Sequence, residues 1–412
     1  MRSADLKAAV FSALAIVIER HPALSSIVMD EDSNDPYFAR LSEINLENSV
    51  TFVTRQNPVS GNGRDVELDT ILEFQHNTSF KEDHGVLPYW RVIIVAPAEP
   101  ENDFVASFIF HHSLGDGASG MVFHRDFLAA LSSNPPPLAS SIVRPVNRPL
   151  LLNLETFLPQ ATPHSPTSPS PSSLWSGTKI IPPTRSNIRS LAFTADATQH
   201  FLQACKLHGT TLTSTLPVLI ASALFCSIPD TFHSLECTIP VSLRRFLPKP
   251  VDEDVIGVYL DAFSVYYDRT LSSSFSWVEA QNSRALINGY LESNGQKVNV
   301  AKFKQIKDMR AFFSGRIGKE RGTSFDVSNL GVMKPGGQGE QGWTMGKVLF
   351  SRSAFVSGSA IAAGVVTGAD GCLTIGFCWQ EGVVERHVVD MVIEKVATGI
   401  GSIADEMRGN RA

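Results

Sequence analysis

The stretch from His111 to Gly117 holds the residue types best suited to chemistry, and it reads His-His-Ser-Leu-Gly-Asp-Gly. It follows an apolar, strand-like run at Phe104–Phe110 and precedes a helix-like run at Met121–Leu131. A strand, a glycine-containing turn and a helix in this order can present one imidazole at the mouth of a channel. Because the ordinary pKa of an imidazole is ~6.5, this group suits a general base that removes a proton from a hydroxyl.

Other interpretations of the two histidines are weaker. Neighbouring strand residues point to opposite faces, so His111 and His112 cannot both bind one metal ion from a regular strand. The chain has no C-x-x-C and no H-E-x-x-H, and we therefore expect no metal site. The more serious alternative is that both are hydrogen-bonded histidines of the core. This alternative does not explain why Asp-Gly closes the turn that follows them. Covalent catalysis would call for a G-x-S-x-G elbow, which is absent.

The H-H-x-x-x-D-G motif resembles that of the acyl-CoA-dependent acyltransferases related to chloramphenicol acetyltransferase and to nonribosomal peptide synthetase condensation domains. Within that superfamily the chain is most similar to fungal alcohol acetyltransferases. Four further stretches resemble landmarks of the family and follow in the family's order: Glu19–Leu24, Leu87–Arg91, Ile239–Arg245 and Val327–Gly331. The D-F-G-W-G signature of the plant branch is absent. Relatives also carry a first strand before the helix that ends at Arg20, so we expect that strand to be dispensable here or the product to be truncated.

The resemblance implies an α/β fold with mixed sheets (α+β in its layering), built as two chloramphenicol-acetyltransferase-like subdomains with an active-site tunnel between them. It gives the role of general base to His112. Alternation along the strand then places His112 on the face of Phe108 and Phe110, and leaves His111 as a packed or hydrogen-bonded support residue. The implied reaction is direct acyl transfer, in a ternary complex, from acetyl-CoA or another acyl-CoA to the hydroxyl of a small molecule, often a secondary metabolite. No bound cofactor is needed.

Two alternatives stay open. One is a stand-alone condensation-type enzyme that takes its acyl group from a carrier protein, although no carrier segment is fused to this chain. The other is a repurposed cyclase or binding protein on the same scaffold, which the intact motif disfavours.

Asp116 is expected to be structural rather than catalytic, because it lies across a turn from His112. In the resembled superfamily an arginine holds this aspartate, and Arg244 is the first candidate here, with its neighbour Arg245 second. An arginine can grip a carboxylate with two parallel hydrogen bonds. Gly115 and Gly117 flank the aspartate and would permit positive φ angles in a tight turn.

Ser328 and Asn329 are candidates for contacts with the substrate or with an oxyanion. A simple turn filled by Ser-Asn-Leu-Gly is an equally good interpretation of these residues.

Composition limits the class of protein. The 412 residues, 43% hydrophobic and 18% charged, predict a globular chain with a large core. A net charge of −6 and the absence of a long basic run argue against a nucleic-acid partner. No apolar stretch is long enough to span a membrane. Five cysteines in apolar contexts indicate reduced core residues, and we expect a cytoplasmic monomer: Cys205, Cys226, Cys237, Cys372 and Cys378.

Half of the 24 prolines fall between Pro135 and Pro183, and the run His164–Ser173 is rich in Pro and Ser. Such a run cannot pack a core and predicts an exposed connection. We expect an N-terminal subdomain at residues 1–160 that carries the motif, a linker at 161–186 and a C-terminal subdomain at 187–412.

Hydrophobic periodicity and caps predict the elements of both halves. The N-terminal half should begin with a helix at Leu6–Arg20. The C-terminal half should open with a helix capped by Thr194 that stops near Gly209. Further helices or amphipathic segments are expected at Leu212–Phe225, Trp277–Leu291, Val298–Phe312 and His387–Met407. Strands are expected at Glu236–Ser242, Val258–Tyr267, Val348–Val356, Ala360–Thr367 and Leu373–Gln380.

Overall fold

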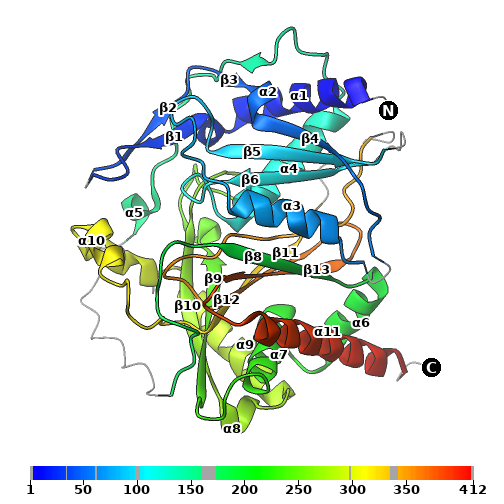
Figure 1. The fold of residues 1–412 in the computed structure, drawn as a ribbon, viewed down its shortest axis with the longest axis vertical. Coiled ribbons are helices and arrows are strands. Elements are labelled where there is room, and N and C mark those ends of the chain that lie inside the picture. Colours follow the sequence, from blue (N-terminus) through cyan, green and yellow to red (C-terminus); the bar gives the residue numbers. More distant parts are fainter. Residues whose placement is uncertain are drawn as a thin grey trace.

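The computed structural model describes residues 3–33, 35–60, 63–98, 103–158, 173–296, 298–334 and 342–409. The chain forms a mixed α/β structure with one main sheet in each half, as the resemblance implied, and the N-terminal half adds two small two-stranded sheets. Figure 1 shows the N-terminal half at the top, in blue and cyan, and the C-terminal half below it.

The N-terminal half is built on a three-stranded sheet in the order β4-β5-β6, with bounds Val50–Thr54, Trp90–Ala96 and Val105–Phe110. β4 and β5 are parallel, whereas β5 and β6 are antiparallel, with Trp90 opposite Phe110. β6 is therefore an edge strand of this sheet. Figure 1 shows α1 (Ser3–Arg20) and α4 (Gly117–Ser132) on one side of the sheet and α3 (Val66–His76) on the side that faces the C-terminal half.

Alternation along β6 divides its side chains between these layers. Phe108 stacks on Phe123 of α4, with ring centroids 3.7 Å apart, and also on Phe110 at 5.0 Å. Ile109 points the other way and packs in a small cluster with Ile93 of β5. Shorter elements complete this half: η1 (Pro22–Ser25), β1 (Ser26–Met29), β2 (Tyr37–Arg40), β3 (Ile44–Asn45), α2 (Leu46–Ser49), β7 (Ile142–Val143) and α5 (Leu154–Phe157).

The C-terminal half is built on a six-stranded mixed sheet in the order β10-β9-β11-β12-β13-β8. Its strands are β8 (Ser186–Ala192), β9 (Ser234–Ser242), β10 (Leu260–Asp268), β11 (Phe325–Val332), β12 (Ile361–Thr367) and β13 (Leu373–Gln380). Only β11 pairs in parallel, with β9 and β12.

Apolar helices cover the sheet face that is remote from the N-terminal half (Figure 1). They are α6 (Ala195–Leu207), α7 (Leu212–Phe225), α9 (Trp277–Leu291) and α11 (Arg386–Gly409). The largest hydrophobic core of the protein lies between these helices and the sheet. Short helices fill the connections: η2 (Arg244–Phe246), α8 (Arg269–Ser272), η3 (Asn299–Gln305) and α10 (Met309–Ser314).

Several predicted elements are confirmed. Thr194 caps α6 by accepting a hydrogen bond from the backbone of Ala197, and Gly209 follows this helix with a φ of +64°. The bounds of α7, α9 and β13 are as expected from their apolar patterns.

Two predicted elements are wrong. The strand expected at Val348–Val356 is irregular backbone that lies across other strands. The amphipathic segment expected at Val298–Phe312 is broken into the 3₁₀ helix η3 and the single-turn helix α10, because its polar residues cap new starts: Asp308 accepts a hydrogen bond from the backbone of Ala311.

Half of the predicted linker also differs from expectation. Residues 161–172, and with them nearly all of the Pro/Ser run, lie outside the described residues. The following stretch, 173–186, is packed on the C-terminal half rather than exposed: Trp175 and Ile180 are buried, and Leu174 forms a bridge with Ser234. The apolar side chains of this stretch, which outweigh its prolines, explain the difference.

Two of the five cysteines were wrongly placed in the core. All five are free thiols, but Cys226 is exposed and Cys372 is half-buried. Within the described ranges no single helix is long and apolar enough to cross a membrane; the bent pair α6–α7 passes that test by composition, and its members are core helices here.

Candidate active site

The motif turn begins where β6 ends. The backbone N–H of His111 still donates to the carbonyl of Tyr89 at 2.8 Å, which extends the β5–β6 pairing by one residue. The chain then turns, and the N–H of Leu114 closes back on the carbonyl of His111 at 3.0 Å. His112, at the outside of this turn, exposes its side chain to the central cavity, where its ring lies 5.7 Å from that of Phe355.

His111 is packed and hydrogen-bonded, as expected of a support residue. Its ring lies 5.1 Å from that of Tyr89 and meets Phe80 edge-on at 6.1 Å. The backbone N–H of Ser113 donates to Nδ1 of His111 at 3.2 Å, and the Ser113 hydroxyl lies 2.8 Å from the same nitrogen. Burial lowers the pKa of His111 below its ordinary value, with a smaller opposing contribution from Glu31. His111 is therefore neutral and held in place at pH 7.

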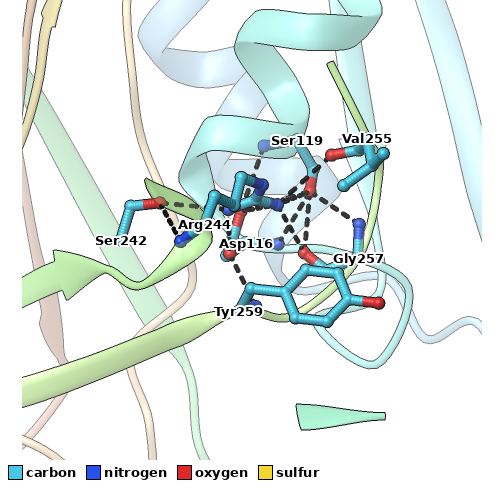
Figure 2. Close-up of polar contacts among 7 residues, drawn as sticks. All are labelled: Asp116, Ser119, Ser242, Arg244, Val255, Gly257 and Tyr259. Atoms are coloured by element: carbon cyan, nitrogen blue, oxygen red, sulfur yellow. Dashed lines mark hydrogen bonds and ion pairs between the residues drawn. The ribbon is translucent and has the colours of Figure 1, made fainter. Parts of the chain in front are cut away.

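The predicted pair of Asp116 and Arg244 is present and buried (Figure 2). Nη1 and Nη2 of Arg244 donate to the two carboxylate oxygens of Asp116 at 2.7 and 3.0 Å. Arg244 comes from η2, just after β9, and its side chain is fully buried. The same guanidinium also donates to the carbonyl of Gly257 at 2.8 Å, and the backbone N–H of Tyr259 donates to Asp116 at 3.0 Å. The C-terminal half thus fixes the turn that carries His112.

Asp116 has a second task as the N-cap of α4. Its carboxylate accepts from the backbone N–H of Ser119 at 3.1 Å, and the Ser119 hydroxyl accepts from the N–H of Asp116 at 3.2 Å. This reciprocal capping box satisfies two amide groups at the helix start. One carboxylate therefore joins the turn, the helix and the other half of the molecule.

The glycines of the motif are needed for space and not for positive φ, contrary to the prediction. Neither Gly115 nor Gly117 has a positive φ. A Cβ at Gly117 would lie 2.6 Å from Leu330 and 3.1 Å from Phe350, both from the C-terminal half. A Cβ at Gly115 would lie 2.6 Å from that of Ser119. The missing side chain of Gly117 allows the two halves to approach at the start of α4, and that of Gly115 leaves room for the Ser119 cap.

A cavity of about 1510 Å³ runs along the free edge of β6, between the two halves. β6 and one face of α4 form its N-terminal wall, and α3 contributes Leu72 and His76. The opposite wall is the irregular segment 342–355, which we call the strap. His111, His112, Asp116 and Gly117 all border the cavity. The sequence motif therefore lies on a large hollow between the two halves.

The strap is held against the C-terminal sheet by close backbone contact. Gly364 of β12 and Gly376 of β13 lie directly opposite each other, and the carbonyl of Phe350 sits over both. A Cβ at Gly364 would come within 2.6 Å of that carbonyl oxygen. The hydroxyl of Thr374 also donates to the carbonyl of Val348 at 2.6 Å. The apolar sequence of the strap predicted a strand, although one glycine in each of two apolar strands was a signal for the close approach of another backbone.

Side chains of the strap connect it to both halves. Arg352 forms an ion pair with Asp326 of β11, and both side chains are largely buried. On the other side, the Ser351 hydroxyl lies 2.9 Å from Nε2 of His76 on α3. Burial, with a smaller effect from Arg91, lowers the pKa of His76 to about 4. His76 is thus a neutral hydrogen-bonding partner of the strap at pH 7.

Ser328 and Asn329 are not brought to the cavity. Both lie in β11 rather than in a turn, and the neighbouring Leu330 lines the cavity instead. The Asn329 amide donates to the Thr213 hydroxyl of α7 at 2.9 Å, and its oxygen accepts from the N–H of Gly331. These bonds satisfy the side chain on the helix-covered side of the sheet. Neither Ser328 nor Asn329 thus lines the cavity, and the Asn329 side chain is engaged by Thr213 and Gly331.

The basic groups around the cavity are mostly engaged. Arg55 is paired with Asp65 at 2.7 Å, Lys81 with Glu31, and Arg352 with Asp326. Within the described ranges no group of three or more His, Cys, Asp or Glu side chains is arranged to hold a metal ion. The site offers free imidazole groups and apolar walls.

Two curated relatives are similar to the chain over nearly its full length. It is 38% identical to the probable alcohol acetyltransferase crmB of Aspergillus fumigatus, covering 96% of this chain and 90% of that protein. It is 24% identical to a probable alcohol acetyltransferase of Fusarium pseudograminearum, covering 95% of this chain and 86% of that protein. No family model matches the chain.

Solved structures with the same fold are more distant in sequence. The trichothecene 15-O-acetyltransferase of Fusarium sporotrichioides aligns with a TM-score of 0.65 at 13% identity, over 97% of this chain and 86% of that one. The first condensation domain of the calcium-dependent antibiotic synthetase aligns with a TM-score of 0.62, also at 13% identity, over 97% of this chain and 88% of that one. The fold implied by the motif is thereby confirmed.

Proposed function

Because the chain belongs to the family of fungal alcohol acetyltransferases, we propose that it transfers an acetyl group from acetyl-CoA to the hydroxyl of a small secondary metabolite, with His112 as general base. The membership rests on the full-length similarity to the relative from Aspergillus fumigatus. The observation that carries the mechanism is the position of His112. Its imidazole is exposed inside a cavity between the two halves, on a turn fixed by the buried Asp116–Arg244 pair.

The proposed reaction is a single transfer within a ternary complex. A ring nitrogen of His112 accepts the hydroxyl proton of the alcohol while the hydroxyl oxygen bonds to the thioester carbonyl carbon. The carbon–sulfur bond of the tetrahedral intermediate then breaks, and the imidazolium returns its proton to the departing thiolate. The products are an acetyl ester and free coenzyme A. No nucleophile of the protein and no bound cofactor take part.

His111 and the Asp116–Arg244 pair act as positioning groups in this scheme. Neither side chain of the pair touches the imidazole through any bond of the structure, and Asp116 is fully occupied by Arg244, Ser119 and Tyr259. Their contribution is to hold the backbone of the turn. The segment that carries His112 is therefore already in position before substrates bind.

We further propose that the protein works as a monomer in a reducing compartment such as the cytoplasm. A single chain supplies both walls of the cavity and both members of the buried ion pair. Its five cysteines are all unpaired, which suits a reducing environment.

The direct test is to incubate the protein with acetyl-CoA and a panel of primary and secondary alcohols and to follow release of free thiol. We expect alcohol-dependent thiol release together with an acetyl ester identified by mass spectrometry. Acetyl-pantetheine attached to a carrier protein serves as a competing donor in parallel reactions. Ester formation with the carrier-bound donor alone would contradict the use of coenzyme A, and absence of ester with both donors would contradict the proposed function.

A further inference from the structure

His124 presents an imidazole to the cavity at a point that the proposed mechanism does not use. It lies on the face of α4 that borders the cavity, a face that returns every three or four residues. Seven residues separate it from Gly117, where the helix begins. At 1.5 Å per residue, His124 lies about 10 Å along the helix from the motif turn.

The ring of His124 has no hydrogen-bonding partner among the described residues. Its nearest ring neighbour is the adjacent Phe123, which meets it edge-on at 5.4 Å. By contrast, the other cavity histidines outside the catalytic role are engaged, His76 with Ser351 and His111 with Ser113. Among the four cavity histidines, only the imidazole groups of His112 and His124 are free in the described structure. His124 is only partly buried and lines the cavity, so its free imidazole is available to a molecule bound there.

The chemistry that His124 offers is that of a neutral imidazole. Burial lowers the pKa of His124 to about 4, so the ring is uncharged at pH 7. A neutral imidazole has one N–H donor and one nitrogen acceptor. It can therefore bond a hydroxyl, which both donates and accepts, or a carbonyl. It gives no charge to attract a phosphate or a carboxylate.

The surroundings of His124 are apolar. Four large hydrophobic residues on α4 line the same stretch of the cavity: Met121, Phe127, Leu128 and Leu131. Further along, Trp343 of the strap meets Phe104 edge-on, with ring centroids 5.1 Å apart. A ligand in this stretch would pack an apolar body against α4, where His124 is the one polar side chain among the helix residues that line the cavity.

We propose that His124 is a second recognition point for the acceptor, and that the acceptor is an extended, largely apolar alcohol with a further hydroxyl or carbonyl remote from the hydroxyl that is acetylated. This inference rests on the proposed function, because the first hydroxyl is placed by His112.

The acceptor fits this position better than the donor does. An acetyl group has two carbons and cannot reach from the motif turn to His124. Coenzyme A carries phosphates, which require cationic partners. Among the described residues, the cavity face of α4 has no basic residue, and the one basic side chain of the cavity without an acidic partner is Lys347, on the strap.

Two eight-carbon probes test the inference, octan-1-ol and octane-1,8-diol. Their affinities are measured by calorimetry for the wild type, for His124→Leu and for His124→Asn, which keeps a donor and an acceptor. Octan-1-ol leaves His124 unpaired, and a buried polar group left unpaired costs about tenfold in affinity. We therefore expect the diol-to-monoalcohol affinity ratio to fall about tenfold in His124→Leu and to be partly restored in His124→Asn.

His387→Leu is the matched control, because His387 is exposed on α11, on the far side of the C-terminal sheet. Its affinity ratio should equal that of the wild type. An unchanged ratio in His124→Leu would overturn the inference. Absence of binding of both probes to the wild type would also overturn it, since the proposed class would then not enter the cavity. Loss of coenzyme A affinity in His124→Leu without a change in the alcohol ratio would assign His124 to the donor instead.

Failure of this inference is distinguishable from failure of the proposed function. Thiol release from acetyl-CoA is measured with the same two alcohols. If thiol is released but the diol-to-monoalcohol affinity ratio does not depend on His124, only the role of His124 in recognition is rejected. A His124-dependent ratio without thiol release and ester rejects acetyl transfer and leaves the recognition point standing.

Discussion

The turn that carries His112 and the strap that faces it across the cavity are held by different forces. Asp116 fixes the turn through a buried two-pronged ion pair, a helix cap and a backbone N–H from the other half. The strap rests with its backbone on two paired glycines of the sheet, and the Arg352–Asp326 ion pair fixes only its end. In a buried charge network, loss of one group disrupts the hydrogen bonds of all the others. A backbone that rests on glycines can instead change its position slightly without such a loss. The turn therefore suits a fixed catalytic group, and the strap suits an adjustable wall.

The largest effect is expected at the turn itself. His112→Ala should lower kcat by about 10²–10⁴-fold, because the proton of the attacking hydroxyl then has no acceptor. The fold and the affinity for coenzyme A should be retained, since His112 is exposed and its side chain makes no hydrogen bond within the described structure. The measurement is single-turnover thiol release, with circular dichroism as the check on folding. Near-normal turnover in a folded His112→Ala protein would rule out the proposed mechanism.

Removing one member of the buried pair should have the next largest effect. Asp116→Ala leaves the Arg244 guanidinium buried without its counter-charge, and Arg244→Ala leaves the Asp116 carboxylate buried without one. Each should cost about 3–5 kcal/mol of unfolding free energy and most of the activity. Because both changes break one network, the double variant should cost less than the sum of the two. Denaturant unfolding of all four proteins measures this coupling.

If the alanine variants do not fold, Asp116→Asn takes their place in the measurement. The neutral asparagine side chain can still cap α4, but it has no charge to pair with Arg244. We expect Asp116→Asn to lie between the wild type and Asp116→Ala in stability. Strictly additive losses in the double variant would show that the pair does not act as a unit.

The strap should respond more weakly. Gly364→Ala places a Cβ within 2.6 Å of the Phe350 carbonyl, so the strap must move away from the sheet. Such overpacking costs about 1–3 kcal/mol, and it should change KM for the alcohol more than kcat. Gly401→Ala is the control, since nothing lies within 4 Å of its added Cβ and alanine favours the helix α11. Equal effects of the two substitutions would mean that the strap is not held by close backbone contact.

The same contrast explains what could be predicted from the sequence. The turn was predictable because its residues, from His111 to Gly117, lie close together in the sequence. The strand before them and the helix after them also have clear hydrophobic periodicity. Arg244 was reached only through the resemblance, since 128 residues separate it from Asp116. The strap was wrongly predicted as a strand because Val348–Val356 is apolar, and only the paired glycines of β12 and β13 redirect it.

The position of Asn329 away from the cavity has a similar cause. Its neighbours Ser328 and Leu330 belong to a strand, so alternation turns the amide toward α7, where the Thr213 hydroxyl accepts its hydrogen bond. The resemblance to the acyltransferase family indicated this position in the chain, but it did not indicate on which face of the sheet the Asn329 side chain lies. His124 was missed although its spacing from Gly117 places both on one helix face, because a single histidine in an apolar helix carries no motif.

Acid should destabilise the contact between the strap and α3. The pKa of His76 is lowered to about 4 in the folded protein, whereas in the unfolded chain it is ~6.5. The stability that neutral His76 provides is therefore present above pH ~6.5 and is lost as the pH falls toward 4, by about 1 kcal/mol per pH unit. His76→Gln should flatten this dependence, while His387→Gln, at an exposed position, should not. An unchanged slope in His76→Gln would contradict this origin of the acid sensitivity.

The smallest effect is expected from cutting the chain between the halves. Limited proteolysis should cleave first within the Pro/Ser run His164–Ser173, because this composition offers no apolar side chain for packing. Cleavage should stop before Leu174, where the chain is bridged to Ser234 and Trp175 is buried. The two fragments should remain associated and active, because the Asp116–Arg244 pair and the cavity walls do not depend on the connection. Gel filtration, mass spectrometry of the fragments and thiol release check each step. First cleavage elsewhere, or dissociation of the fragments under native conditions, would mean that this run is part of what holds the halves together.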